Sequence, residues 1–524
     1  MKLPFVVQKC KDFQNFIRSN KLLVLLFFVF CGIRIGLPIL YPGSYIDEWY
    51  HLLSGHTFAH FGHFAEMYLG SYYFRGAYVS FFTAIYFKLF GESVFVAKLV
   101  PATIGIIDFV LVYLVGKQVF SKKFQLLLLL AIFTLSPWII LNHFYIRMYA
   151  FYETFSLFVA LLALNTVEQV EQKNVQKLLR NYLILGGGVV IGNFLSQDNV
   201  FLILASISLL TFYGMYLVYC TELLSNNSFI QKLFSRKTKI YTAVIGMAGI
   251  ITSFIISEKI REKITVFLQG DTATIFHFNT LGHVRFFFEQ NGVLSILAVI
   301  FLILYLLQPK KEKKLNVLVF MTFVFLAIHF LQSRELQLVR TVSYFLPIFC
   351  VFSVALLDKL KRPSQYLTAF ILIAFTLTSF PSNFFTTPQI PNEGVYLGGK
   401  IYSAIEENCN SSLLITSLDP GILQFYHLHP DYELHDYLGL GEESYTYSSI
   451  TERYINVYSQ TPVINHLSEL SQIYADHQSI CYLERTPVID IYLTKESQAF
   501  IEKNFYPIFQ DKNLRLLAKP SRAS

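Results

Sequence analysis

Long apolar stretches separated by short polar segments fill the first 385 or so residues of this chain. A helix needs about 20 largely apolar residues to cross the hydrocarbon core of a bilayer. The segment 77–90 is apolar but short for a crossing, so we expect an interfacial, re-entrant or tilted helix there. Runs of sufficient length predict eleven membrane-spanning helices, at residues 21–41, 94–116, 124–142, 149–166, 181–196, 199–220, 240–256, 292–308, 315–331, 341–357 and 365–381.

The positions of the basic residues predict how the chain is oriented. If 77–90 does not cross, every basic segment between predicted helices falls on the side of the basic N-terminus, as the positive-inside rule requires. The outer side then carries the loops 42–93 and 143–148 and the long loop 257–291, which could be a lid or a static plug. We therefore expect a protein of a prokaryotic cytoplasmic membrane with its N-terminus inside and its C-terminus outside.

From about residue 386 the pattern changes to shorter alternations that are typical of a small α/β domain. Asp419 and Pro420 are typical of a helix N-terminus, where an acid caps the helix and a proline begins its first turn. We divide the chain into a transmembrane module, 1–385, and an extracytoplasmic α/β domain, 386–524. Within that domain the periodicity predicts strands at 412–417, 432–437, 480–485 and 514–520, and helices at 419–428, 461–477 and 495–505.

The composition supports a membrane protein. Of the 524 residues, 54% are hydrophobic, 17% are aromatic and only 15% are charged, which excludes a soluble globular protein. The net charge of +7 comes from short basic clusters between apolar runs, so we predict no nucleic-acid partner. The six cysteines are scattered and indicate no disulfide framework, although Cys409 and Cys481 share the polar region and could form a bridge.

Two adjacent acids, Asp47 and Glu48, follow the first predicted helix. A carboxylate beside hydrocarbon is costly unless it is solvated, pairs with a cation, binds a metal or takes part in acid–base chemistry. We interpret the pair as catalytic. The alternative, in which both acids are the solvated start of an outer loop, stays open on this segment alone.

A histidine-rich stretch over residues 51–76 is expected to form an amphipathic helix in the membrane interface. His56, His60 and His63 are spaced by four and three residues, so they could share one helix face and bind a metal. Contacts of interfacial histidines with headgroups are the alternative. The acid pair is a second candidate for a metal.

Four segments, at 45–51, 81–105, 142–158 and 339–352, resemble the GT-C superfamily of polyprenol-dependent glycosyltransferases. The similarity is to the branch of the dolichyl-phosphate-mannose protein mannosyltransferases and the lipid A aminoarabinose transferases. The resemblance implies a polytopic α-helical protein with about 11–13 transmembrane helices. Its expected partners are the bilayer, a polyprenyl-phosphate-linked sugar and an acceptor that is a protein, a lipid or a glycan.

The resemblance also implies a role for each matching residue. Asp47 falls on the first-loop acid of the family and would be the general base that takes the proton of the acceptor hydroxyl, with Glu48 as its neighbour. Arg147 and Arg340 match family arginines and would bind the donor phosphate, which suits a planar guanidinium. Arg334 is a further candidate for phosphate binding without support from a motif. Interfacial arginines without a catalytic role are the alternative.

Other residues could support the site. His143 and Asp198 lie in outer loops, and Asp198 could equally cap a turn. Glu153 stands where the family has an aspartate, and Lys98 stands where it has an arginine. A divalent cation, Mg²⁺ or Mn²⁺, that bridges the acid pair to the phosphate is compatible with these charges but is not required by them.

The predicted activity is transfer of a sugar, for example a mannosyl or other hexosyl group, from the polyprenyl-phosphate donor to an acceptor hydroxyl, with inversion at the anomeric carbon. Two alternatives belong to other classes. One is a transporter or flippase for a lipid-linked glycan, which would also need arginines on the outer side. The other is a non-catalytic membrane scaffold that carries the α/β tail as a binding module.

Overall fold

The structure is a computed structural model of the 524-residue chain. The predicted spans at 199–220 and 240–256, the loop 257–291 and the domain boundary at 386 lie outside the residues that it describes, so they stay predictions. The described residues are 19–40, 46–67, 72–73, 76–172, 296–308, 312–332, 345–357, 364–374, 399–436, 445–449, 451–485, 493–510 and 514–520, with positions 177, 180–181, 183–184, 187 and 294.

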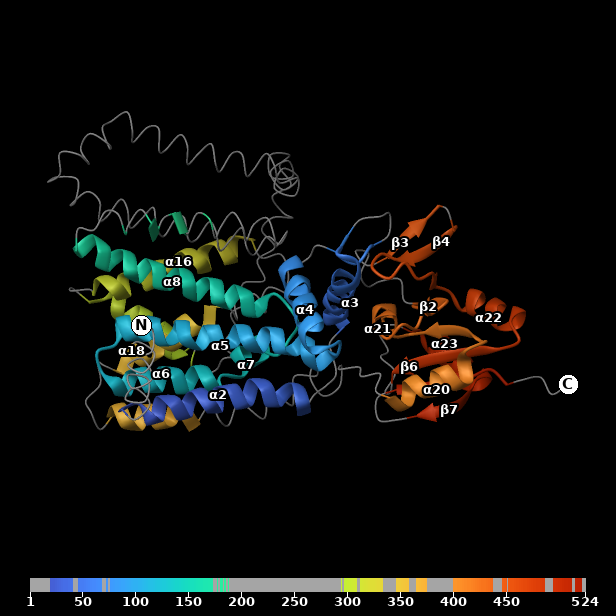
Figure 1. The fold of residues 1–524 in the computed structure, drawn as a ribbon, viewed down its shortest axis with the longest axis horizontal. Helices are drawn as coiled ribbons and strands as arrows, with labels where there is room; N and C mark the ends of the chain where they lie inside the picture. Colours follow the sequence, from blue (N-terminus) through green and yellow to red (C-terminus); the bar gives the residue numbers. More distant parts are fainter. Residues whose placement is uncertain are drawn as a thin grey trace, which may run out of the picture. The chain divides into compact units, whose positions relative to one another are not determined.

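The chain divides into two compact units (Figure 1). The first unit comprises residues 1–32, 104–143 and 149–380, and the second comprises residues 33–103, 144–148 and 381–524. The helices α2 (Lys21–Leu40) and α5 (Val94–Val119) contribute residues to both units. The second unit therefore combines the first predicted outer loop with the predicted α/β segment.

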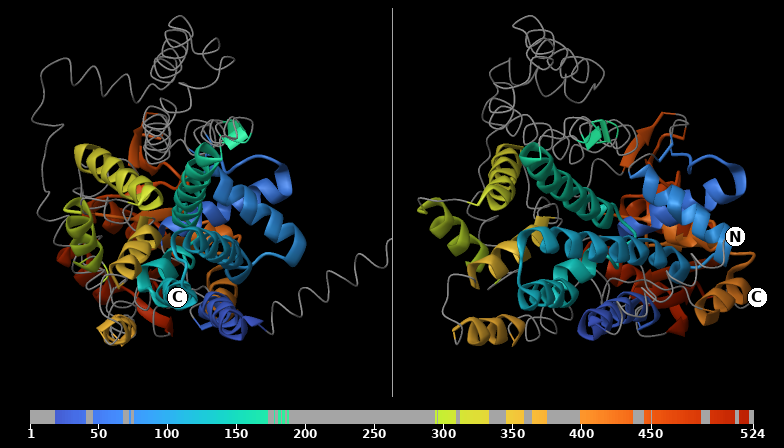
Figure 2. Two further views of the ribbon diagram at one scale, coloured as in Figure 1. Left: turned by 90° about the vertical axis from the view of Figure 1, so that its left-hand side faces the viewer. Right: turned by 60° about the vertical axis from the view of Figure 1, so that its left-hand side comes forward.

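Apolar helices build the first unit. Besides parts of α2 and α5, it contains α6 (Lys123–Leu135), α7 (Pro137–Asn142), α8 (Tyr149–Glu171), α16 (Lys313–Gln332) and α18 (Leu346–Leu357). The helix α18 is buried along its whole length and packs against α6 and α8, while α16 also packs against α8 (Figure 2). Among the described residues, three helices are long and apolar enough to cross a membrane: α2, α5 and α8.

The span predicted at 124–142 is wrong in one respect, because it is two helices rather than one. The helix α6 ends at Leu135 and α7 begins at Pro137. A proline inside a helix has no N–H to donate, and it disfavours helical dihedral angles in the residue before it. Ser136 accordingly adopts an extended conformation, with φ −65° and ψ 120°.

A close helix pair lies in the second unit. The helices α3 (Ile46–Phe61) and α4 (Ala77–Phe90) pack against each other. At Gly55 an added Cβ would lie 2.8 Å from Cγ2 of Thr83, so only glycine permits this approach. The helix predicted over 51–76 is too long: α3 ends at Phe61, where Gly62 takes the left-handed conformation with φ 76°.

A six-stranded sheet lies in the C-terminal part of the second unit, in the order β5-β2-β1-β6-β8-β7 (Figure 1, orange to red). The strands β5, β2, β1 and β6 are parallel, and β8 and β7 continue the sheet in antiparallel pairs. Strands β3 (Tyr445–Ser448) and β4 (Arg453–Asn456) form a separate hairpin. The six strands are β1 (Leu413–Thr416), β2 (Tyr432–Leu434), β5 (Val463–Ile464), β6 (Ile480–Arg485), β7 (Tyr506–Gln510) and β8 (Leu514–Ala518).

Helices cover both faces of this sheet. One face packs against α22 (Leu467–Asp476) and α23 (Lys495–Asn504) in a core that includes Tyr482. Successive side chains of a strand point to opposite faces, so Cys481 points away from that core. Cys481 forms a disulfide with Cys409 at the end of α20 (Gly399–Cys409). The bridge considered in the sequence is therefore formed, and it holds α20 on the opposite face.

Candidate active site

The acid pair lies at the start of α3. Because α3 begins at Ile46, Asp47 and Glu48 belong to its first turn, where the helix dipole favours negative charge. The side chain of Asp47 lies outside the described residues. Glu48 is buried, and its Oε1 accepts a hydrogen bond of 2.6 Å from the backbone N–H of Ile146. A buried carboxylate that a backbone donor holds in place does not fit a solvated start of a loop.

A buried lysine interacts electrostatically with the same carboxylate. The charge of Lys98, on α5, interacts with that of Glu48, and the Lys98 Nζ lies 3.7 Å from the centroid of the Phe144 ring. These two attractions offset part of the cost of removing an ammonium group from water. The sequence indicated Lys98 only as a substitute for a family arginine. A lysine inside an apolar helix was the available signal that it belongs to a site.

The segment 144–148 brings a predicted phosphate ligand to this place. It contains Ile146, whose backbone N–H binds Glu48. It also contains Arg147, whose side chain is buried. The backbone N–H of Arg147 donates to the carbonyl of Tyr145 at 2.8 Å. The first turn of α3 and the segment with Arg147 are therefore in direct contact. The other predicted site residues, Arg334, Arg340 and Asp198, lie outside the described residues.

A second buried polar cluster lies in the first unit. His143 Nε2 lies 3.0 Å from Oδ2 of Asp108 and 3.4 Å from Oε1 of Glu153. Asn142 donates from Nδ2 to Oε2 of Glu153 at 2.9 Å. The structure thus brings together His143 and Glu153, both predicted as supporting residues. It adds Asp108, a carboxylate inside an apolar helix that sequence reasoning missed.

Gly105 makes room for the imidazole of this cluster. It lies one helical turn before Asp108 on α5, and a Cβ built on it would be 2.7 Å from both Cγ and Nδ1 of His143. Real Cβ atoms do not approach other atoms so closely. The ring of His143 therefore lies directly on the backbone of α5.

The histidine face predicted on α3 is correct for two of its three members. His56 Nδ1 lies 2.7 Å from Oε2 of Glu92, and His60 Nε2 lies 2.5 Å from Oε1 of the same carboxylate. His63 follows the end of the helix, and its Nδ1 contacts the carbonyl of Phe64 at 2.9 Å. The third group of the cluster is Glu92, in the turn between α4 and α5.

The helix with the acid pair is also bonded to the C-terminal part of its unit. Tyr50 donates to Oδ2 of Asp419 at 2.5 Å, and Asp419 caps α21 (Pro420–Phe425) as predicted. Glu433 is buried nearby and accepts hydrogen bonds from Tyr445 at 2.8 Å and Asn456 at 2.9 Å. Burial, and secondarily the charge of Asp419, raises the pKa of Glu433 to about 8.

No family model and no curated protein matches the chain, but solved structures do. ArnT from Cupriavidus metallidurans bound to undecaprenyl phosphate matches with a TM-score of 0.54 over 97% of this chain and 99% of its own, at 11% identity. Its apo state matches with the same TM-score and identity. The chain has the GT-C fold. The Archaeoglobus fulgidus oligosaccharyltransferase matches with a TM-score of 0.50 over 88% of this chain and 69% of its own, at 13% identity.

The GT-C fold agrees with the resemblance carried by the sequence motifs and with a polytopic helical membrane protein. At identities of 11% and 13% the likeness extends to the fold alone. Activity, donor and acceptor have to be argued from this chain's own residues.

Proposed function

We propose that this chain is a membrane glycosyltransferase that moves a sugar from a polyprenyl phosphate to an acceptor hydroxyl. The observation that carries the proposal is the hydrogen bond between Glu48 and the backbone of Ile146. It joins the turn that contains Asp47 to the segment that contains Arg147, so a candidate base and a candidate phosphate ligand lie on contacting segments. ArnT, which has the same fold, binds undecaprenyl phosphate.

In the proposed reaction Asp47 accepts the proton of the acceptor hydroxyl. The freed oxygen forms a bond to the anomeric carbon of the sugar, and the bond from that carbon to the phosphate oxygen breaks. One displacement of this kind inverts the anomeric configuration. The polyprenyl phosphate leaves with two negative charges, which Arg147, Arg340 and Arg334 would stabilise. A well-placed general base contributes roughly 10²–10⁴-fold in rate.

We assign Glu48 a positioning role rather than direct proton transfer. Its Oε1 is bound to the N–H of Ile146, and Lys98 interacts with its charge. The proton transfer to Asp47 is written without Mg²⁺ or Mn²⁺, which the sequence allows at the acid pair but does not require. The supporting role that the sequence predicts for His143 and Glu153, which pair with each other in the first unit, stays part of the proposal. Asp198 stays a candidate from sequence.

We place the site and the C-terminal domain on the outer face of the cytoplasmic membrane. The bridge between Cys409 and Cys481 supports this orientation, because disulfides form and persist in oxidising compartments. An outer site would use a donor whose lipid lies in the bilayer and whose phosphate lies at the interface.

A transfer assay tests the proposal. Purified protein in lipid is given polyprenyl phosphates that carry labelled mannose, glucose or aminoarabinose, together with extracts that contain protein, lipid and glycan acceptors. We expect one donor to be consumed with label appearing on an acceptor, and the product anomer to be inverted. Passage of intact donor across the bilayer without transfer would support the flippase instead. If neither transfer nor passage of the donor is observed, the result would support the non-catalytic scaffold.

A further inference from the structure

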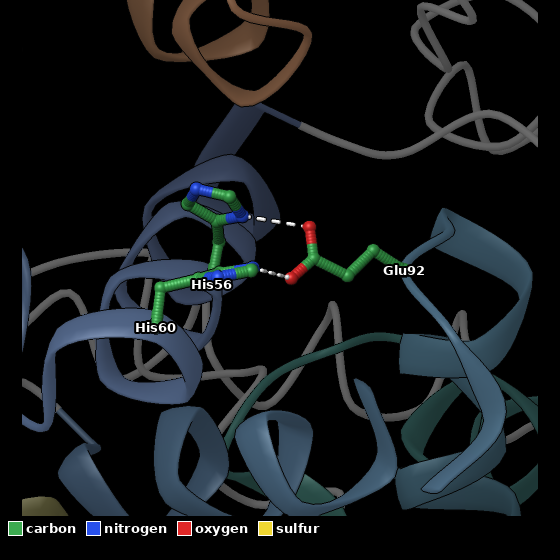
Figure 3. Close-up of side chains that lie close together, drawn as sticks. All are labelled: His56, His60 and Glu92. Atoms are coloured by element: carbon green, nitrogen blue, oxygen red, sulfur yellow. Dashed lines mark hydrogen bonds and ion pairs between the residues drawn. The ribbon is translucent and has the colours of Figure 1, made fainter. Parts of the chain in front are cut away.

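His56, His60 and Glu92 converge on one point at the surface of the second unit (Figure 3). His56 and His60 are four residues apart on α3, so they lie on one helix face with ring centroids 4.6 Å apart. Glu92 reaches them from the turn between α4 and α5, and each of its oxygens faces one imidazole (Figure 3). Three potential metal ligands therefore come from two segments of the chain. Glu92 is 36 residues from His56 and 32 residues from His60.

The three groups have the chemistry of a transition-metal site. Two imidazole nitrogens and one carboxylate are a ligand set that zinc accepts, with a fourth position for water. Their ligand atoms all lie within 4.8 Å of one another. Bonds of about 2.0–2.2 Å to a tetrahedral ion require nitrogen-to-oxygen separations of about 3.3 Å. The present separations of 2.7 and 2.5 Å would widen by less than 1 Å, which side-chain rotation of Glu92 can supply.

We propose that His56, His60 and Glu92 bind one Zn²⁺ ion, with water as the fourth ligand. Their exposure suits such a site: the side chains of His56, His60 and Glu92 are 15%, 54% and 30% exposed, so an ion can enter without rearrangement of the core. Soft thiolate ligands are absent from the cluster, and imidazole with carboxylate favours zinc over magnesium or calcium.

The bound ion would tie α3 to the turn between α4 and α5. Gly91 fixes this turn with a φ of 86°, and its N–H caps α4 by donating to the carbonyl of Phe87. The ring of His427, after α21, packs against that of His56 with centroids 5.3 Å apart. The site thus lies where three segments of the second unit meet. The proposal does not depend on the proposed transferase activity, since none of its ligands belongs to the candidate active site.

Cobalt substitution tests the proposal on the full-length protein in detergent. Metal-free protein is titrated with Co²⁺, which absorbs strongly in the visible range when its site is tetrahedral and weakly when it is octahedral. We expect one equivalent of Co²⁺ with the tetrahedral spectrum, displaced by one equivalent of Zn²⁺. Both His60→Ala and Glu92→Gln should lose the spectrum or weaken binding by more than about tenfold. The control His63→Ala, next to the site, should bind as the wild type does.

Several results would overturn the proposal: an octahedral spectrum, binding that survives both variants, or an equal loss in His63→Ala. If the variants fail to fold, X-ray absorption of the zinc-loaded wild type decides, because the site requires two imidazole ligands and two oxygens. The variant Asp47→Asn shows whether the ion binds instead at the acid pair. If the ion binds at the histidine site, this variant should retain the cobalt spectrum, whether or not the variant transfers sugar.

Discussion

Individual residues explain why the buried polar groups of this chain take their positions. Lys98, Asp108 and Glu48 are charged residues inside or beside apolar helices, and each lies against a partner of opposite charge or a donor. The acid pair and His143 could be predicted from the sequence. Lys98 and Asp108 could not be assigned, because the pairing depends on which helices pack together.

We predict that Gly105→Ala destabilises the protein by about 1–3 kcal/mol, the usual cost of overpacking a core. The new methyl group would displace the ring of His143 from α5. Thermal unfolding in detergent measures the change. Gly36→Ala on α2 is the control, since nothing lies within 4 Å of its added Cβ. Equal stability of both variants would show that His143 does not lie on α5.

We predict that the C-terminal sheet loses stability as the pH rises from about 5 to 8. Glu433 has a pKa of about 8 in the folded protein and an ordinary value of 4.5, so between these values the folded state binds a proton that the unfolded state has lost. The contribution of this proton to the free energy of unfolding is complete below pH 4.5 and is lost as the pH rises through 8. Between these pH values the free energy of unfolding falls by up to about 1.4 kcal/mol per pH unit.

Hydrogen exchange of β2 amides, corrected for intrinsic rates, measures this effect. Glu433→Gln should flatten the pH dependence, whereas Glu502→Gln on the exposed side of α23 should leave it unchanged. A slope that Glu433→Gln does not alter would mean that another group is responsible.

At the scale of elements, two predictions that rest on local pattern were correct, and one failed because a distant strand decides it. The cap at Asp419 and the strand at 480–485 were predicted correctly. The helix predicted at 461–477 begins instead at Leu467, because Val463 and Ile464 pair with β2 as a strand. No local pattern reveals a two-residue strand that exists only through a partner far along the chain.

The disulfide joins residues 72 positions apart, so we expect it to stabilise the C-terminal part of the chain by about 2–5 kcal/mol. Cys409→Ser with Cys481→Ser should speed hydrogen exchange in β1 and β6. Reducing agent should have the same effect on the wild type and no further effect on the double variant.

Peptide mapping of protein from cells tests the orientation: free thiols at both positions would contradict an outer domain.

At the scale of the whole molecule, the motifs predicted the GT-C fold even though identities to proteins with this fold are as low as 11%. The length of apolar runs and the order of polar segments are largely kept when individual residues change. Burial in lipid requires that a side chain be apolar, but it does not require a particular residue. What such patterns do not specify is the chemistry, because one fold supports many donors and acceptors.

The central claim is that Asp47 is the base of a sugar transfer, and a single-turnover measurement tests it most directly. Wild type and Asp47→Asn are loaded with the donor found in the transfer assay, mixed with acceptor and quenched over time. We predict equal donor binding and a transfer rate about 10²–10⁴-fold lower in Asp47→Asn. Equal transfer rates, or movement of donor across the bilayer without transfer, would contradict the account.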